Sequence, residues 1–295
     1  MELRHLHYFV AVAEELHFGH AAERLEIAQP PLSQQIHNLE KELGVQLFYR
    51  TKRQVQLTEA GQIFLHQARL TLAQAEQAVQ MVRKADKGEL GQLTLGFVGS
   101  ATSELLPRLI RAFHQRFPEV ELQLRELTTA QQIRALRDRR IQLGILRPPV
   151  ASDQLVVRTL VQETLILALP ENHQLATLDN IEVKALAEEN FIMFPRQHGQ
   201  GLYDQIISLC QQAGFSPRIV QEAIQMQTIT GLVAAELGIA IIPHSARFLR
   251  HQGLVYRTLQ PAIQTAELAI AWYKDDQSPV LRNFVRHASQ LEHGA

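Results

Sequence analysis

Apolar residues recur every three or four positions near the start of the chain. Over residues 3–15 they fall on one face of a helix, with polar side chains on the other. An alanine-rich run over residues 20–25 predicts a second, short helix that packs closely on its neighbour. A third helix is expected from Gln29, where two prolines suit the first turn, to Gly44, which supplies the stop.

The third helix has an apolar and a polar face. Its apolar face is formed by Leu32, Ile36, Leu39 and Leu43. Their helical spacing predicts that all four lie in the core. The opposite face carries Ser33, Gln34, Gln35, His37 and Asn38. These side chains can read base edges in the major groove, so we interpret this as a recognition helix, with an ordinary solvent-facing surface as the simpler alternative.

Two β-prone runs, residues 45–50 and 55–58, follow that helix and predict a hairpin with a basic tip. A hairpin directly after a helix-turn-helix is typical of a wing. Its cations are expected to meet the sugar-phosphate backbone or the minor groove: Arg50, Lys52 and Arg53.

A long amphipathic run comes next, with Thr58 placed to cap its start. Its apolar seam consists of Leu65, Ala68, Leu72, Ala75, Val79 and Val82. The seam predicts a helix that pairs two copies of the chain, and packing on its own domain is the alternative. The two glycines of residues 87–91 predict the end of this helix and a hinge into the next domain.

From residue 92 onward, β-prone and helical runs alternate, which is typical of a parallel sheet flanked by helices. Strands are expected at 93–98, 120–124, 141–146, 165–169, 191–194, 218–220, 239–242 and 268–272. Helices are expected at 105–117, 130–139, 203–213, 228–237 and 281–291. The pattern restarts part-way along, which indicates two similar lobes.

Composition narrows the class of protein. A 295-residue chain with 46% hydrophobic and 20% charged residues fits about two soluble domains. No apolar run is long enough to cross a bilayer, and no secretory signal begins the chain, so we expect a cytoplasmic protein. Net charge is −1, and residues 1–60 hold six Lys or Arg against eight Asp or Glu. DNA binding is therefore inferred from motif geometry rather than from total charge.

No pattern in the sequence points to catalysis. Residues 96–99 lack a dinucleotide fingerprint, and the single Cys210 reads as a buried structural thiol. His17 and His20 share a helical face without a further ligand at metal-binding spacing, so neither a metal nor a cofactor is expected. An exported solute-binding protein would explain residues 92–295 alone, but the first 60 residues argue against it.

The order of these parts and the literal residues resemble the LysR-type transcriptional regulators. The matching segments are Met1-Glu2-Leu3-Arg4-His5-Leu6, Ala21-Ala22-Glu23-Arg24-Leu25, Gln29-Pro30-Pro31-Leu32-Ser33, Leu39-Glu40, Leu43-Gly44, Leu57-Thr58 and Gly61. The resemblance implies an α/β chain with an α-dominated winged helix-turn-helix, a long linker helix and a two-lobed periplasmic-binding-protein-like α/β effector domain. It also implies a homodimer or a homotetramer, as a dimer of dimers, which activates or represses promoters according to a bound co-inducer.

We therefore expect three parts: a DNA-binding domain at 1–58, a linker and dimerisation helix at 59–88, and an effector domain at 89–295. Within the effector domain, lobe I is expected at about 91–161 and 266–295 and lobe II at about 162–265. The expected partners are promoter DNA, a small organic acid, further copies of the chain and RNA polymerase, with no membrane.

Carried over position by position, the family's DNA-contacting pattern falls on Gln29, Pro30, Pro31, Ser33, Gln34, Arg50 and Arg53. Gln35 and His37 share the same polar face, and Lys52 belongs to the same hairpin. Many relatives carry arginine at the position of Gln34, so we expect one phosphate or guanine contact fewer here.

Ligands of open α/β sheets bind at the carboxyl ends of strands, in the crevice between lobes. The candidates there are Ser100, Thr102, Thr128, Thr129, Arg147, Pro195 and Arg196. Hydroxyl-bearing loops with two arginines favour an anion. The resemblance is nearest to the branch that senses aromatic or dicarboxylic acids, in which residues matching Ser100, Thr129 and Arg147 line effector sites. Helix capping by Ser100 and Thr129, and structural ion pairs of Arg147 and Arg196, are the alternatives.

Overall fold

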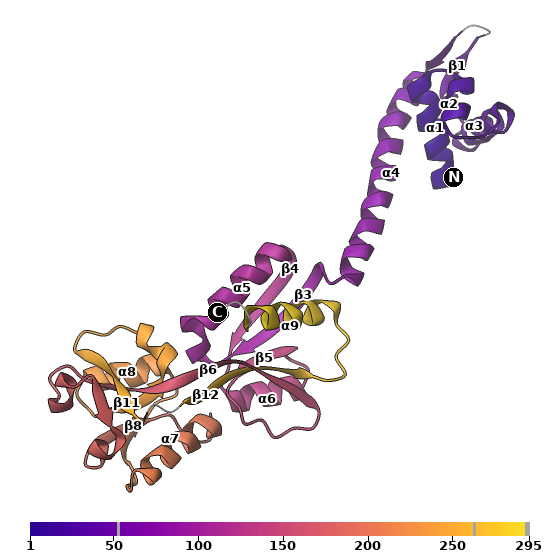
Figure 1. Cartoon of the computed structure of the whole chain (residues 1–295). Helices are drawn as coiled ribbons and strands as arrows, with labels where there is room; N and C mark the ends of the chain where they lie inside the picture. The colour runs from indigo at the N-terminus through magenta and orange to yellow at the C-terminus, as the bar shows by residue number, and fades with distance from the viewer. Residues whose placement is uncertain (52–53, 262–263, 293–295) are drawn as a thin grey trace. The chain divides into compact units, whose positions relative to one another are not determined.

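The computed structural model of the chain describes residues 1–51, 54–261 and 264–292. It divides into two compact units, Met1–Lys84 and Ala85–Ala295, and each is considered by itself (Figure 1). Within the described residues, no helix is both long and apolar enough to cross a membrane.

The first unit contains the predicted helices and hairpin. The elements are α1 (Leu3–Glu15), α2 (Phe18–Arg24), α3 (Gln29–Leu43), β1 (Phe48–Arg50) and β2 (Val55–Leu57). Helix α2 begins earlier than predicted because the ring Nδ1 of His17 accepts a hydrogen bond from the backbone N–H of His20 at 3.1 Å and caps the helix. The hairpin strands are shorter than predicted, and Val45 is exposed before β1 begins.

The core of this unit forms around the ring of Phe9, which lies 5.3 Å from the ring of Phe48 between centroids. Three of the four predicted core positions of α3 are fully buried: Leu32, Ile36 and Leu39. The prediction for Leu43 is wrong, because this side chain is 36% exposed. Leu43 lies in the last turn, beside the left-handed cap Gly44, where α3 has run past the core cluster.

Helix α4 (Glu59–Asp86) follows, and the Oγ1 of Thr58 accepts from the N–H of Gly61 at 2.9 Å, as expected of a cap. The predicted apolar seam of α4 has two different environments. Ala68 and Leu72 are buried in the core of the first unit. Val79 and Val82 are 50% and 70% exposed. Packing on its own domain thus accounts for the first half of the seam and not for the second half, where Val79 and Val82 are exposed.

The predicted hinge at residues 87–91 is a packed part of the second unit rather than a free connection. The side-chain amide of Asn283 donates to the carbonyl oxygen of Lys87 at 2.8 Å. Gly88 has φ +68°, and a Cβ there would lie 2.5 Å from the carbonyl carbon of Pro279. Strand β3 already begins at Leu90.

The second unit has two lobes, as predicted (Figure 1). Lobe I contains β3 (Leu90–Phe97), β4 (Glu119–Glu126), β5 (Leu143–Leu146), α5 (Leu105–Arg116), α6 (Thr129–Arg137) and α9 (Pro279–Glu292). The three strands are parallel and have the order β4-β3-β5. Phe113 of α5 packs on Phe284 of α9 with 4.9 Å between ring centroids, so these helices share one core.

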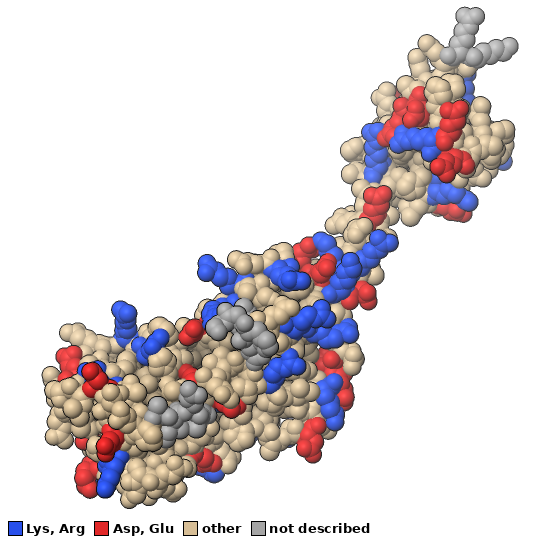
Figure 2. Space-filling model, in the orientation of Figure 1, with Lys and Arg blue, Asp and Glu red and all other residues tan. Residues whose placement is uncertain are grey.

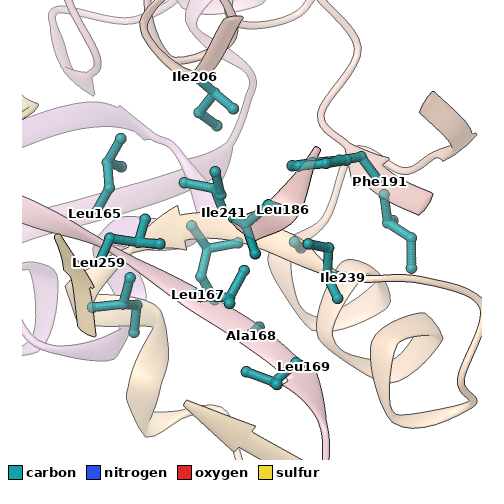
Figure 3. Packing of buried hydrophobic residues seen from close by; sticks show 14 of the residues in the cluster. Leu165, Leu167, Ala168, Leu169, Leu186, Phe191, Ile206, Ile239, Ile241 and Leu259 are labelled. Carbon is teal, nitrogen blue, oxygen red and sulfur yellow. The ribbon is translucent and has the colours of Figure 1, made fainter. Parts of the chain in front are cut away.

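Lobe II contains β7 (Asn180–Glu182), β8 (Asn190–Met193), β9 (Arg218–Glu222), β10 (Ala240–Pro243), β11 (Leu254–Gln260), α7 (Gln200–Gln212) and α8 (Met226–Ala234). Leu167, Phe191 and Ile241 lie in its core (Figure 3). Cys210 is also fully buried there, and burial raises the pKa of its thiol to about 11, as expected of an unreactive structural cysteine.

Two long strands run between the lobes, and the sequence pattern identified only part of each. Strand β6 (Leu155–Pro170) pairs with β12 (Gln264–Tyr273) through its first part and with β10 and β11 through its last residues. Sequence analysis found only residues 165–169 of β6 and missed β7 and β11. Short 3-10 turns at Gly99–Ser103 (η1), Gln174–Thr177 (η2), Val183–Leu186 (η3) and His244–Phe248 (η4) complete the unit.

Candidate functional site

The predicted recognition surface is the exposed face of α3. Gln29, Pro30, Pro31, Gln34 and His37 are exposed, and Ser33 and Gln35 are half-buried. Ala28, the residue before the helix, offers no side chain to cap it, and Pro30 and Pro31 carry no backbone N–H, so among residues 29–31 Gln29 alone has an N–H to offer.

Gln34 has a partner within its own helix. Its amide nitrogen donates to the side-chain oxygen of Asn38 at 3.0 Å, one turn further on. This contact limits the rotamers of Gln34 and leaves its amide oxygen free to accept from a base. The side chain that distinguishes this chain from many relatives is therefore oriented by Asn38, which sequence analysis placed on the polar face without a role.

Arg50, predicted to contact DNA, forms an ion pair inside the first unit. Its guanidinium donates to Glu40 at 2.7 Å and lies 5.0 Å from the ring centre of Phe18. Glu40 also accepts from the backbone N–H groups of Leu47 and Phe48 at 2.9 and 3.2 Å. A single carboxylate thus joins α3 to the first strand of the hairpin. The other two predicted wing contacts, Lys52 and Arg53, lie outside the described residues.

Arg147, the predicted anion ligand, directly follows strand β5 and is 6% exposed. Its Nη2 donates to Glu163 at 2.7 Å, and its Nε donates to the Oγ of Ser100 at 3.2 Å. Burial lowers the pKa of Arg147, while the charge of Glu163 acts in the opposite direction. The structural ion pair weighed for Arg147 is therefore present, and Glu163 balances its charge.

A small cavity of about 40 Å³ lies between the lobes. Lobe I contributes Ser100, Thr129 and Arg147 to its wall, and lobe II contributes Phe194 and Leu202 among others. The Oγ1 of Thr129 accepts from the backbone N–H of Arg147 at 3.3 Å. Three of the predicted effector residues thus meet at one cavity.

The other four predicted effector residues do not line this cavity. Thr102 donates to the carbonyl oxygen of Gly99, and Thr128 caps helix α6. Pro195 is buried. Arg196 is 57% exposed and forms two hydrogen bonds with Asp204, at 2.7 and 3.0 Å. For Arg196 the structure shows the ion pair that was the alternative to ligand binding.

A larger cavity of about 430 Å³ adjoins the same ion pair. Glu163 lines it, together with Leu105 and Leu160 of lobe I and His244 and Ser245 that follow β10. The backbone N–H of Ser245 donates to the second oxygen of Glu163 at 2.7 Å. Arg147 faces the small cavity and Glu163 the large one, so the pair lies between the two.

Two family models match this chain. The bacterial regulatory helix-turn-helix protein model of the lysR family covers residues 3–62, and the LysR substrate binding domain model covers residues 86–292. The chain belongs to the LysR family of transcriptional regulators.

Known regulators are similar to this LysR chain, in sequence and in structure, over nearly its whole length. The HTH-type transcriptional regulator AlsR of Bacillus subtilis (strain 168) is 44% identical over 292 residues, which cover 99% of this chain and 96% of AlsR. The crystal structure of CbnR, a LysR family transcriptional regulator, matches with TM-score 0.90 and 30% identity, covering 98% of this chain and 100% of CbnR. Full-length CbnR complexed with its target DNA matches with TM-score 0.87 and 29% identity over 99% and 100% of the two chains.

These comparisons confirm the predicted family, the fold class and a regulatory rather than enzymatic role. The protein is a LysR-type DNA-binding transcriptional regulator with an effector-binding domain.

Sequence analysis missed several site residues of this LysR chain. Glu163 lies in the part of β6 that was not predicted, and Phe194 and Leu202, at the end of one predicted element and just before another, received no role. Glu40 was part of the family signature but received no role. One signal was available: an acid at an otherwise apolar helix face, such as Glu40, is buried only when it has partners.

Proposed function

We propose that this LysR regulator binds a small organic acid between the lobes of its second unit and that the acid changes how the recognition helix engages promoter DNA. The observation that carries the proposal is the meeting of Ser100, Thr129 and Arg147 at the cavity between the lobes. Both hydroxyl oxygens accept hydrogen bonds from Arg147, so each hydroxyl keeps its own hydrogen to donate to a ligand carboxylate.

The size of the cavity bears on the kind of acid. A cavity needs about 10–15 Å³ for each water that it holds, so one of about 40 Å³ has room for a few waters or for an acid of only a few carbons. The aromatic or dicarboxylic acids that the resemblance implies need more space. Their binding therefore requires the lobes to separate along β6 and β12, and we propose this motion as the first step of the response.

On the DNA side, we propose base or phosphate contacts from the exposed face of α3: Gln29, Pro30, Pro31, Ser33, Gln34, Gln35 and His37. Lys52 and Arg53 are proposed as backbone anchors of the hairpin, and Arg50 as the residue that holds the hairpin through Glu40. Thr102, Thr128, Pro195 and Arg196 are proposed only as surroundings of the effector site, since the cavity wall does not include them.

We further propose that the exposed part of the α4 seam pairs two copies of the chain, and that pairs associate into a tetramer. The exposure of Val79 and Val82 supports this, because apolar side chains on a long helix favour a partner helix. We also propose RNA polymerase as a further partner and the cytoplasm as the compartment, since both suit a regulator of transcription.

Isothermal titration with acetate, succinate, muconate and benzoate tests the effector proposal. Thr129→Val removes the hydroxyl but keeps the shape of the side chain. We expect it to weaken about tenfold the binding of whichever acid the unmodified protein binds with a measurable heat. Thr102→Val is the matched control, because its hydroxyl lies outside the small cavity. Absence of heat with every acid, or equal losses from both variants, would contradict the proposal.

The DNA proposal is tested by gel shift on the DNA upstream of its own gene over a range of salt concentrations. Specific phosphate contacts predict that binding weakens steadily as salt rises. His37→Ala and Gln34→Ala should lower affinity for the preferred sequence more than affinity for unrelated DNA. Loss of equal size on both DNAs would assign these side chains to phosphates instead of bases.

A further inference from the structure

Lobe I carries an open groove of about 690 Å³ beside helix α9. Its wall is made by Arg158 of β6, Trp272 of β12, and Leu281, Arg282, Val285 and Arg286 of α9. Neither of the two cavities beside the Arg147–Glu163 pair shares any residue with this groove. The groove is therefore a separate feature of lobe I.

The groove is cationic. Arg282 and Arg286 are exposed one turn apart on α9, and within residues 1–51, 54–261 and 264–292 neither guanidinium forms an ion pair or a hydrogen bond. Like charges at this spacing repel each other. Among the described residues of the wall, Asp276 is the one carboxylate, and it already accepts from the N–H of Ser278. Figure 2 shows Lys and Arg side chains gathered over the region where Figure 1 draws α9.

The groove also has a flat apolar wall that is held in place. The guanidinium of Arg158 lies 5.9 Å from the centre of the Trp272 ring and donates to the hydroxyl of Ser289. Val285 is half-buried and supplies apolar surface in the same wall, whereas Leu281 is only 1% exposed. Arg158 and Trp272 are fixed by contacts of their own, so a ligand would meet an ordered indole face with guanidinium groups beside it.

We propose that this groove binds a flat aromatic anion at a site distinct from the one between the lobes. The indole and Val285 accept the ring, and Arg282 and Arg286 donate to the carboxylate or sulfonate group. The bound anion relieves the repulsion between the two arginines. It also touches β6 and β12, the strands that run between the lobes.

The chain suits a direct test, since Trp272 is its single tryptophan. Anilinonaphthalene sulfonate, a flat aromatic anion that accepts energy from tryptophan, is titrated into the full-length protein while Trp272 emission is followed. We expect saturable quenching. The Arg282→Gln/Arg286→Gln variant should bind the probe about tenfold more weakly, because two charge-assisted hydrogen bonds are lost.

The matched control is Arg134→Gln/Arg137→Gln, which removes two exposed arginines from α6 of the same lobe and changes net charge equally. It should bind the probe like the unmodified chain. N-phenylnaphthylamine, the uncharged counterpart of the probe, should bind more weakly than the sulfonate. Should the double variant prove unstable, Arg286→Gln alone serves, with a smaller loss expected.

Three outcomes overturn the proposal. Quenching that does not saturate shows that no site exists in the assembled protein. Equal affinities of the α9 and α6 variants show that the probe binds elsewhere. Equal affinities of the charged and uncharged probes show an apolar surface without anion recognition. None of these results bears on binding between the lobes, which is measured with the Thr129→Val variant.

Discussion

Two ion pairs, one in each unit, are built from the same residue types but lie in different surroundings. In the pair of the first unit, the Glu40 side chain is 10% exposed and the Arg50 side chain 35%. In the pair of the second unit, Arg147 and Glu163 are each 7% exposed. The first pair leaves part of a positive charge at the surface beside α3, and the second keeps both charges inside.

This difference decides what each pair can respond to. Glu40 is fully used by Arg50 and two backbone N–H groups, so the first pair fixes the hairpin against α3. The Arg147–Glu163 pair lies between two cavities, and an anion bound as we propose would compete with Glu163 for the guanidinium. We therefore regard the first pair as a constant brace and the second as one that a ligand can rearrange.

The largest expected effect is on the buried pair. Arg147→Met should lower the free energy of unfolding of the second unit by about 3–5 kcal/mol, because Glu163 would remain buried without a counter-charge. Urea unfolding followed by Trp272 emission measures this. Adding Glu163→Leu to the variant should restore most of the loss. A double variant no more stable than Arg147→Met would show that packing, not charge, accounts for the effect.

A smaller effect is expected in the first unit. Glu40→Gln should destabilise the hairpin by about 1.5–3 kcal/mol, because the hydrogen bond from Arg50 loses its ionic partner. Hydrogen exchange of the Leu47 and Phe48 amides reports on this locally. Glu42→Gln on the same helix is the control, since Glu42 is exposed and should leave both amides protected. Unchanged protection in Glu40→Gln would show that the carboxylate does not hold the hairpin.

Arg50→Gln separates bracing from DNA contact. If Arg50 acts through Glu40, the Arg50→Gln change lowers the affinity for DNA at every salt concentration. The slope of the logarithm of the DNA-binding constant against the logarithm of the salt concentration then stays unchanged. A direct phosphate contact would reduce that slope by about 0.9. Gel shifts over a salt series decide between the two, with Arg53→Gln as the variant expected to reduce the slope.

The smallest effect is expected at the exposed pair Arg196–Asp204, which serves as the reference for the other two pairs. Arg196→Gln should leave the unfolding midpoint unchanged, because exposed ion pairs contribute little. Arg196 lowers the pKa of Asp204, so the small stabilisation it provides is present at neutral pH and is lost as pH falls through that lowered pKa. Carboxyl NMR titration should show the Asp204 pKa rising in the variant. An unchanged pKa would mean that the pair does not persist in solution.

Local patterns in the sequence predicted the helices, but they did not predict the contacts between segments that lie far apart in the chain. The burial of Leu32, Ile36 and Leu39 could be predicted from their helical spacing alone. The prediction for Leu43 was wrong because burial at the end of a helix depends on which other segments pack there. The first part of β6 has no continuous apolar pattern, since residues such as Arg158 and Glu163 interrupt it, and its partner strand β12 lies about a hundred residues later.

The candidate site shows the same limit. Ser100, Thr129 and Arg147 were expected at the ends of strands, and the topology of the sheet brings them together. Arg196 also follows a strand, but Asp204 one helical turn into α7 holds it at the surface. Glu163 was missed because its partners lie 16 and 82 residues away, and no local spacing encodes such distances.

The junction at Gly88 has a practical consequence for building hybrid regulators. Residues 87–88 are held by Asn283 and lie against Pro279, with no room for a side chain at Gly88. A foreign DNA-binding half should therefore be joined before Lys87, within the exposed last turns of α4. A fusion junction placed after Gly88, or a substitution of that glycine, would disrupt the packing of the second unit itself.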